Sequence, residues 1–70
     1  MEEYKTRMKK EYVELKDRYV KLQKILVAHK AGTLDFELNC PVALLKRQAH
    51  VMKDYLDILE QRAIIEGVDL

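Results

Sequence analysis

The sequence predicts an all-α fold, an antiparallel two-helix hairpin resembling a coiled coil, that assembles into an oligomeric helical bundle. Three observations predict it. Apolar residues recur at heptad spacing in two long stretches. A short connector between Gly32 and Pro41 separates these stretches, which favours a fold-back. The chain has only 70 residues, so its small core needs support from disulfides, a metal or a partner subunit.

The first helix is predicted at about residues 2–31, where the sequence has no Gly or Pro. Gly32 suits a left-handed C-cap, and His29 and Lys30 in the last turn complement the helix dipole. The apolar residues at spacings of four and three form the first seam: Met8, Tyr12, Leu15, Tyr19, Leu22 and Leu26.

The connector, residues 32–40, is predicted to be extended and anchored rather than flexible. Leu34, Phe36 and Leu38 alternate with polar residues, which indicates one apolar face tucked against the helices.

The second helix is predicted at about residues 41–66, with Pro41 in its first turn and Gly67 as its stop. Its apolar residues form the second seam: Leu45, Ala49, Met52, Leu56, Leu59 and Ala63. We therefore expect a single hairpin domain over residues 1–70.

Each helix carries a further apolar stripe that a hairpin alone cannot bury. The valine stripe comprises Val13, Val20 and Val27, and the leucine-isoleucine stripe comprises Leu44, Val51, Ile58 and Ile65, each with members seven residues apart. A helix with two apolar stripes touches more than one neighbour. We predict that both stripes form the interface of a homo-oligomer, whose subunit number the pattern leaves open.

Composition excludes several classes of protein. Cys40 is the only cysteine, so no intrachain disulfide forms and a reducing cytoplasm is expected. With His29 and His50 it lacks zinc-site spacing, and no metal or other cofactor is expected. No stretch is apolar enough for a membrane span or a signal peptide. The net charge of +1 argues against general DNA binding.

Charge is unevenly divided, however. Residues 1–31 hold nine basic and five acidic residues, a net +4, and residues 32–70 hold four and seven, a net −3, so the helices should attract. Lys9, Lys16 and Lys30 share one heptad position beside the first seam, and a basic surface extends through Arg7, Arg18, Lys21 and Lys24. The plainer interpretation is a solvated face with pairs such as Glu14–Arg18 and Asp17–Lys21.

No catalytic constellation is present, so we expect a protein that is not an enzyme. Cys40 at the start of one helix and His29 at the end of the other would lie at the same end of the hairpin, so a catalytic Cys/His pair is geometrically possible. The favoured interpretation of Cys40 is a small apolar residue that fills the start of the helix.

The tyrosines suggest binding. Tyr12 and Tyr19 lie in the first seam and are expected in the core, with hydroxyls reaching polar partners. Gln48, Tyr55 and Arg62 follow at seven-residue spacing along one edge of the second helix. Such a row at a subunit junction would stack a base and hold a phosphate, or it would form a hydrogen-bond ladder between helices.

The sequence also resembles a known group of proteins. The residues that carry the resemblance are the run from Glu11 to Leu22, then Leu44, Leu45, Gln48, Met52, Tyr55, Ile58, Leu59 and Arg62. They are similar to small phage helical-hairpin proteins first labelled by relation to crAss-like phages. That wider class resembles the oligomeric sponges by which phages sequester cyclic oligonucleotide signals of the CBASS and Thoeris defences.

The resemblance implies binding without catalysis, with a nucleotide enclosed at subunit junctions. Those sponges carry a Tyr-Arg pair at the start of the hairpin and a Lys further along the same helix. Tyr4, Arg7 and Lys21 stand in for them here, at a different spacing. The expected ligand is a cyclic nucleotide in the host bacterial cytoplasm. The alternative is a protein-interaction module that grips a host protein through an apolar stripe.

Overall fold

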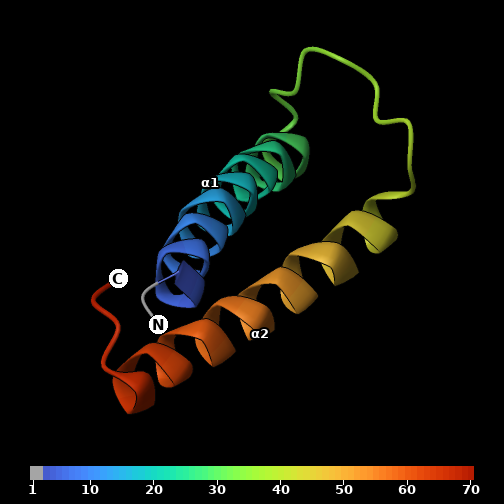
Figure 1. The fold of residues 1–70 in the computed structure, drawn as a ribbon. Helices are drawn as coiled ribbons and strands as arrows, with labels where there is room; N and C mark the ends of the chain where they lie inside the picture. Colours follow the sequence, from blue (N-terminus) through green and yellow to red (C-terminus); the bar gives the residue numbers. More distant parts are fainter. Residues whose placement is uncertain (1–2) are drawn as a thin grey trace.

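The computed structural model describes residues 3–70 and contains two helices, α1 over Glu3–Ala31 and α2 over Val42–Glu66. The helices run antiparallel along a rod of 47 × 17 × 17 Å, joined at one end by the connector (Figure 1). The described residues include no strand, so the all-α hairpin prediction is confirmed for one chain. The predicted helix start at residue 2 lies outside the described residues. Neither helix is apolar over a length that would cross a membrane.

Both helices end in a left-handed glycine. Gly32 has φ +74° and Gly67 has φ +69°. The N–H of Thr33 donates to the Ala28 carbonyl at 2.9 Å, and the N–H of Val68 donates to the Ala63 carbonyl at 2.8 Å. This six-to-one bond is the Schellman arrangement, which satisfies carbonyls that a helix end leaves free.

The Gly67 cap gives a direct prediction. A side chain in the left-handed region costs about 1–2 kcal/mol, so Gly67→Ala should lower the free energy of unfolding by about 1 kcal/mol. Gly67→Asn should cost less, because Asn tolerates this conformation. Urea unfolding followed by circular dichroism measures both. Equal losses for Ala and Asn would contradict this origin.

Two details around the connector differ from the prediction. Pro41 precedes α2 instead of occupying its first turn, because its ψ of 137° is extended. Its carbonyl instead accepts the N–H of Leu44 at 3.0 Å. Phe36 is 53% exposed, so the predicted tucked face is reduced to Leu34 and Leu38, which are half-buried.

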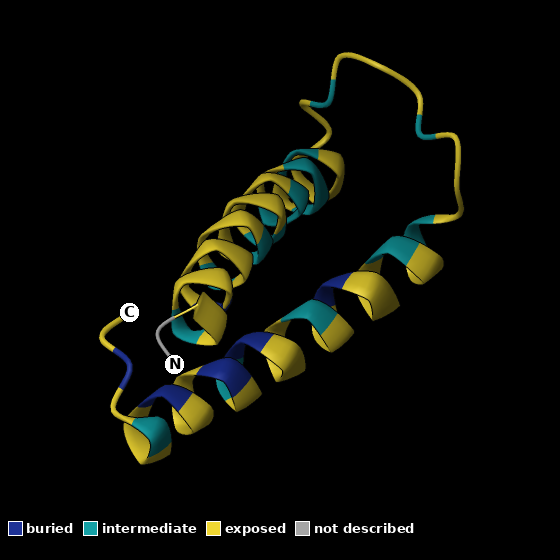
Figure 2. Ribbon diagram, in the orientation of Figure 1, coloured by how far each residue is buried: buried dark blue, intermediate teal, exposed yellow. Residues whose placement is uncertain are grey.

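The two predicted seams do face each other. Every member is buried or half-buried (Figure 2). The main core cluster lies toward the chain ends and joins Met8, Leu59, Ala63 and Val68, with Tyr12 and Leu15 packed against it. Val68, just beyond the α2 cap, is a core residue that the sequence analysis missed. Its burial follows from the cap, which turns the chain back onto the helix.

Both further stripes are exposed on the single chain. All seven residues named above have exposed side chains, and so does Ile64, which belongs to neither stripe. This leaves regular lines of apolar surface in water, the pattern expected of an interaction surface rather than of scattered exposed residues. Assembly of chains remains a prediction.

The opposite net charges of residues 1–31 and 32–70 do not lead to ion pairs between α1 and α2 among the described residues. Every ion pair found among residues 3–70 joins residues four apart on one helix, including the predicted Glu14–Arg18 and Asp17–Lys21 pairs at 3.9 and 2.9 Å. Such exposed pairs contribute little to stability. Apolar packing and two tyrosine–glutamate hydrogen bonds join the helices instead.

Candidate functional site

The residues that flank the seams divide between two opposite sides of the hairpin. In an antiparallel pair, positions flanking the same edge of the two seams lie together. The tyrosine side comprises Glu11 and Arg18 of α1 with Gln48, Tyr55 and Arg62 of α2. The lysine side includes Lys16, Gln23 and Lys30 of α1 with Lys46, Lys53 and Glu60 of α2. The valine stripe borders the lysine side, and the leucine-isoleucine stripe borders the tyrosine side.

On the tyrosine side, the structure brings two predicted site residues together. Arg7 and Tyr55 both line a groove of about 370 Å³, together with Glu11 and Arg18. The Tyr55 hydroxyl donates a hydrogen bond to the Glu11 carboxylate. This contact fits the interhelical alternative for Tyr55, while its ring remains partly exposed beside two arginines.

The other predicted site residues do not converge on that groove. Gln48 lines a separate hollow of about 460 Å³ with Leu44 and Val51. Arg62 donates to Glu66 at 3.0 Å, and Lys21 pairs with Asp17 at 2.9 Å. Tyr4 is partly exposed in the first turn of α1. A pocket using all six therefore requires more than one chain.

On the lysine side, a groove of about 410 Å³ runs between the helices toward the connector. Its lining combines apolar and cationic side chains: Tyr19, Gln23, Leu26, Val27 and Lys30 from α1, and Lys46, Ala49, His50 and Lys53 from α2. Gln23 donates to the Tyr19 hydroxyl at 2.9 Å. This groove was not predicted as a site.

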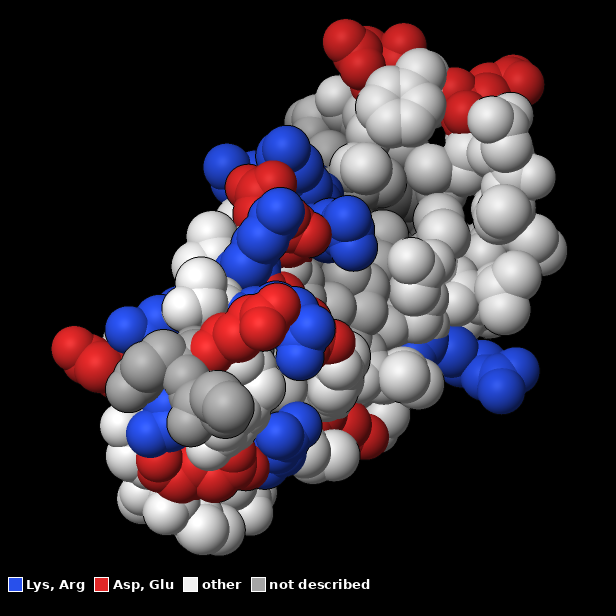
Figure 3. Space-filling view, in the orientation of Figure 1, with Lys and Arg blue, Asp and Glu red and all other residues white. Residues whose placement is uncertain are grey.

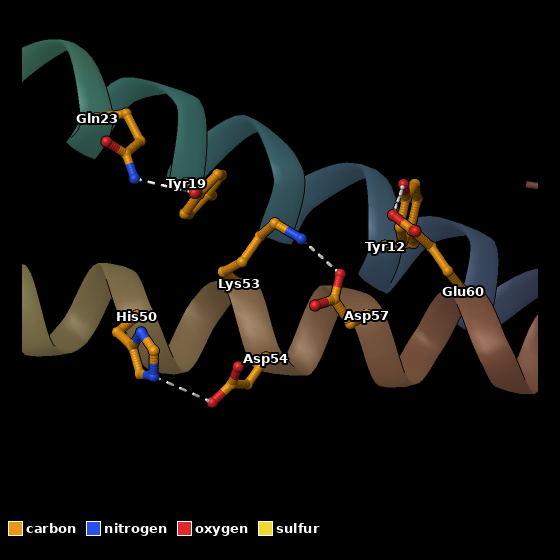
Figure 4. A network of polar contacts seen from close by, with 8 residues as sticks. All are labelled: Tyr12, Tyr19, Gln23, His50, Lys53, Asp54, Asp57 and Glu60. Carbon is orange, nitrogen blue, oxygen red and sulfur yellow. Dashed lines mark hydrogen bonds and ion pairs between the residues drawn. The ribbon is translucent and has the colours of Figure 1, made fainter.

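Two of its basic side chains have an acidic neighbour, and two do not. Lys53 donates to Asp57 at 2.6 Å, which raises the pKa of its ammonium group. Figure 4 shows Lys53 reaching from α2 into the space between the helices, below Tyr19. His50 lies 3.7 Å from Asp54. Lys30 and Lys46 have no ion-pair partner among residues 3–70, so they supply the net positive charge of the groove.

The surrounding surface is mixed in charge. In Figure 3, basic and acidic side chains alternate over α1, and further acidic side chains lie over the connector. A uniformly basic face of the kind that binds duplex DNA is not visible in this view.

Because of the two hydrogen bonds between the helices, the free energy of unfolding depends on pH in the alkaline range. Tyr12 donates to Glu60 at 2.6 Å, and Tyr55 donates to Glu11. These bonds, with some desolvation, raise the pKa of both tyrosines above their usual value of 10.0. Because the folded chain holds these protons more tightly, their stabilisation is complete below about pH 10 and is lost as pH rises through the raised pKa values.

We therefore expect the free energy of unfolding to fall above about pH 10. The Tyr12→Phe/Tyr55→Phe variant should show a shallower fall, and Tyr4→Phe should retain the wild-type slope. Urea unfolding at a series of pH values measures the slope, and tyrosinate absorbance follows the titration. An unchanged slope in the double variant would contradict the assignment.

The structure places both members of the suggested Cys/His pair in one hollow. Cys40 and His29 line the same hollow of about 430 Å³ at the connector. Cys40 is exposed, so the interpretation that it fills the helix start is wrong; the extended Pro41 leaves it outside α2. No group of three or more His, Cys, Asp or Glu residues in the described part of the chain is placed to hold a metal ion.

Comparison with known proteins gives one match. The model of the family described as Sequestin matches residues 2–65, which include the connector and almost all of both helices. No curated protein and no solved structure matches the chain.

Proposed function

The chain belongs to the Sequestin family, and from this premise we propose that it is a non-enzymatic phage counter-defence protein that sequesters a cyclic nucleotide immune signal. The family name denotes sequestration, which supports a binding protein without catalysis. The family match over residues 2–65 carries the proposal. A small helical hairpin fits the resemblance to the oligomeric phage sponges.

We further propose that the ligand binds at junctions between subunits in the host cytoplasm. The exposed stripes border grooves that contain aromatic and cationic side chains, such as Tyr55 and Arg7. An aromatic ring stacks on a base, and a guanidinium binds phosphate in bidentate fashion. Six residues are the proposed ligand contacts: Tyr4, Arg7, Lys21, Gln48, Tyr55 and Arg62.

Calorimetry of the purified full chain against a panel of cyclic di- and trinucleotides tests the proposal. We expect heat of binding with at least one member and recovery of that nucleotide chemically unchanged. Absence of heat with the whole panel would overturn nucleotide sequestration. Conversion of the nucleotide would overturn the non-enzymatic assignment.

The second candidate function is a protein-interaction module. The exposure of both stripes supports this module as much as it supports an oligomeric sponge. It predicts that one stripe stays free for a host protein. Light scattering distinguishes the candidates together with the calorimetry. A single-chain mass of 8.3 kDa without nucleotide binding supports the module, whereas an oligomer that binds a nucleotide supports sequestration.

A further inference from the structure

We propose that the lysine-side groove is a binding site for the phosphate-bearing ligand, with the ring of a nucleotide against Tyr19 and its phosphate between Lys30 and Lys46. This inference rests on the proposed function, and it adds to the six proposed contacts a second set on the side of the hairpin opposite Tyr55. The volume of about 410 Å³ is in the range of small-molecule sites.

The floor of the groove suits a planar ring. Tyr19, Leu26 and Ala49 line it from both helices. Gln23 donates to the Tyr19 hydroxyl at 2.9 Å, which anchors the phenol at its oxygen. A fixed aromatic ring stacks on a base with little loss of conformational entropy. Gln23 also retains an amide oxygen that can accept a hydrogen bond from a base.

The rim of the groove suits a phosphate. Lys30 from the last turn of α1 and Lys46 from the first turns of α2 both line it, and neither has an ion-pair partner among the described residues. Lys53 is held by Asp57 at 2.6 Å and is therefore not counted as a phosphate contact. Two unpaired ammonium groups at one end of an apolar groove favour an anion with an apolar body over a simple inorganic ion.

The groove also adjoins the predicted interface. Val27 lines the groove and belongs to the valine stripe. A subunit packed on that stripe would cover the open side of the groove and exclude water from a bound ligand. Ligand binding at this place is thus expected to strengthen the assembly.

Calorimetry with the nucleotide that binds best in the cyclic panel tests this site. The Lys30→Gln/Lys46→Gln variant removes two charge-assisted contacts. Each contact contributes about 1.4 kcal/mol, which corresponds to about tenfold in affinity, so this variant should bind on the order of 100-fold more weakly. The matched control, Lys9→Gln/Lys24→Gln, removes the same charge at positions outside this groove. It should bind within about twofold of the wild type. Tyr19→Leu should weaken binding, and Tyr19→Phe should keep the stacking contribution.

The outcomes separate the two proposals. Full-strength binding by Lys30→Gln/Lys46→Gln, with loss in Arg7→Gln/Arg62→Gln, would overturn the groove and leave the proposed function standing. Binding of pyrophosphate as tight as that of the nucleotide would overturn the stacking of the ring on Tyr19. Absence of any nucleotide binding to the wild-type chain would overturn both proposals. Circular dichroism of each variant confirms that the helices are intact.

Discussion

Leu59→Ala is expected to lower the free energy of unfolding by about 3 kcal/mol, within the 2–5 kcal/mol typical of a buried leucine truncated to alanine. Leu59 is 0% exposed and joins the core cluster to Met8 across the hairpin. A two-helix chain has few other buried residues to compensate.

The control is Ile64→Ala, five residues further along α2. Ile64 is 82% exposed and belongs to neither stripe, so its truncation should cost about 0.5 kcal/mol or less. Urea unfolding monitored by circular dichroism measures both variants. A loss at Ile64 equal to that at Leu59 would mean that α2 presents a different face to the core in solution.

The second large effect is expected at the leucine-isoleucine stripe. Ile58 is 52% exposed on the single chain, yet we predict that an identical neighbour covers it. Ile58→Asp would then place an unpaired charge in the interface, at a cost of about 3 kcal/mol or on the order of 100-fold in association. Light scattering should show the mass falling to that of one chain, 8.3 kDa.

Gln61→Asp is the matched control for that variant. It introduces the same side chain at an exposed position of α2 that belongs to neither stripe, so the assembled mass should be retained. A wild-type mass of one chain would refute the oligomer itself. Dissociation by Gln61→Asp as complete as by Ile58→Asp would show that added negative charge, rather than the stripe, controls assembly.

The seams were predictable because heptad spacing leaves a helix one orientation that buries its apolar residues. Met8 and Leu56 were placed correctly by spacing alone. The alternation around Phe36 predicted a tucked apolar face that Phe36 does not join. A connector without a ladder of backbone hydrogen bonds imposes no period of two on its side chains. Val68 lies beyond the helix that ends at Gly67, so the heptad pattern does not include it, although a Schellman cap frequently packs the residue after the glycine.

The lysine-side groove was harder to find from the sequence. Lys30 was recognised as part of a basic row, but its relation to Lys46 depends on which residues of the two helices are level with each other. That register is set by packing between helices and not by the periodicity of either one. The row formed by Tyr55 and Arg62 has its period within one helix, so the sequence alone predicts it.

The position of the core cluster has a consequence for folding kinetics. The hydrogen bonds between helices join residues 48 and 44 positions apart, and the cluster extends from Met8 to Val68. The cost of closing a loop grows only with the logarithm of its length, so bringing these distant residues together costs little more than closing a shorter loop. The buried core cluster lies toward the chain ends, whereas the connector end holds the open groove. We therefore expect contacts between the two ends of the chain, around Met8 and Val68, to affect the folding rate more than the turn does.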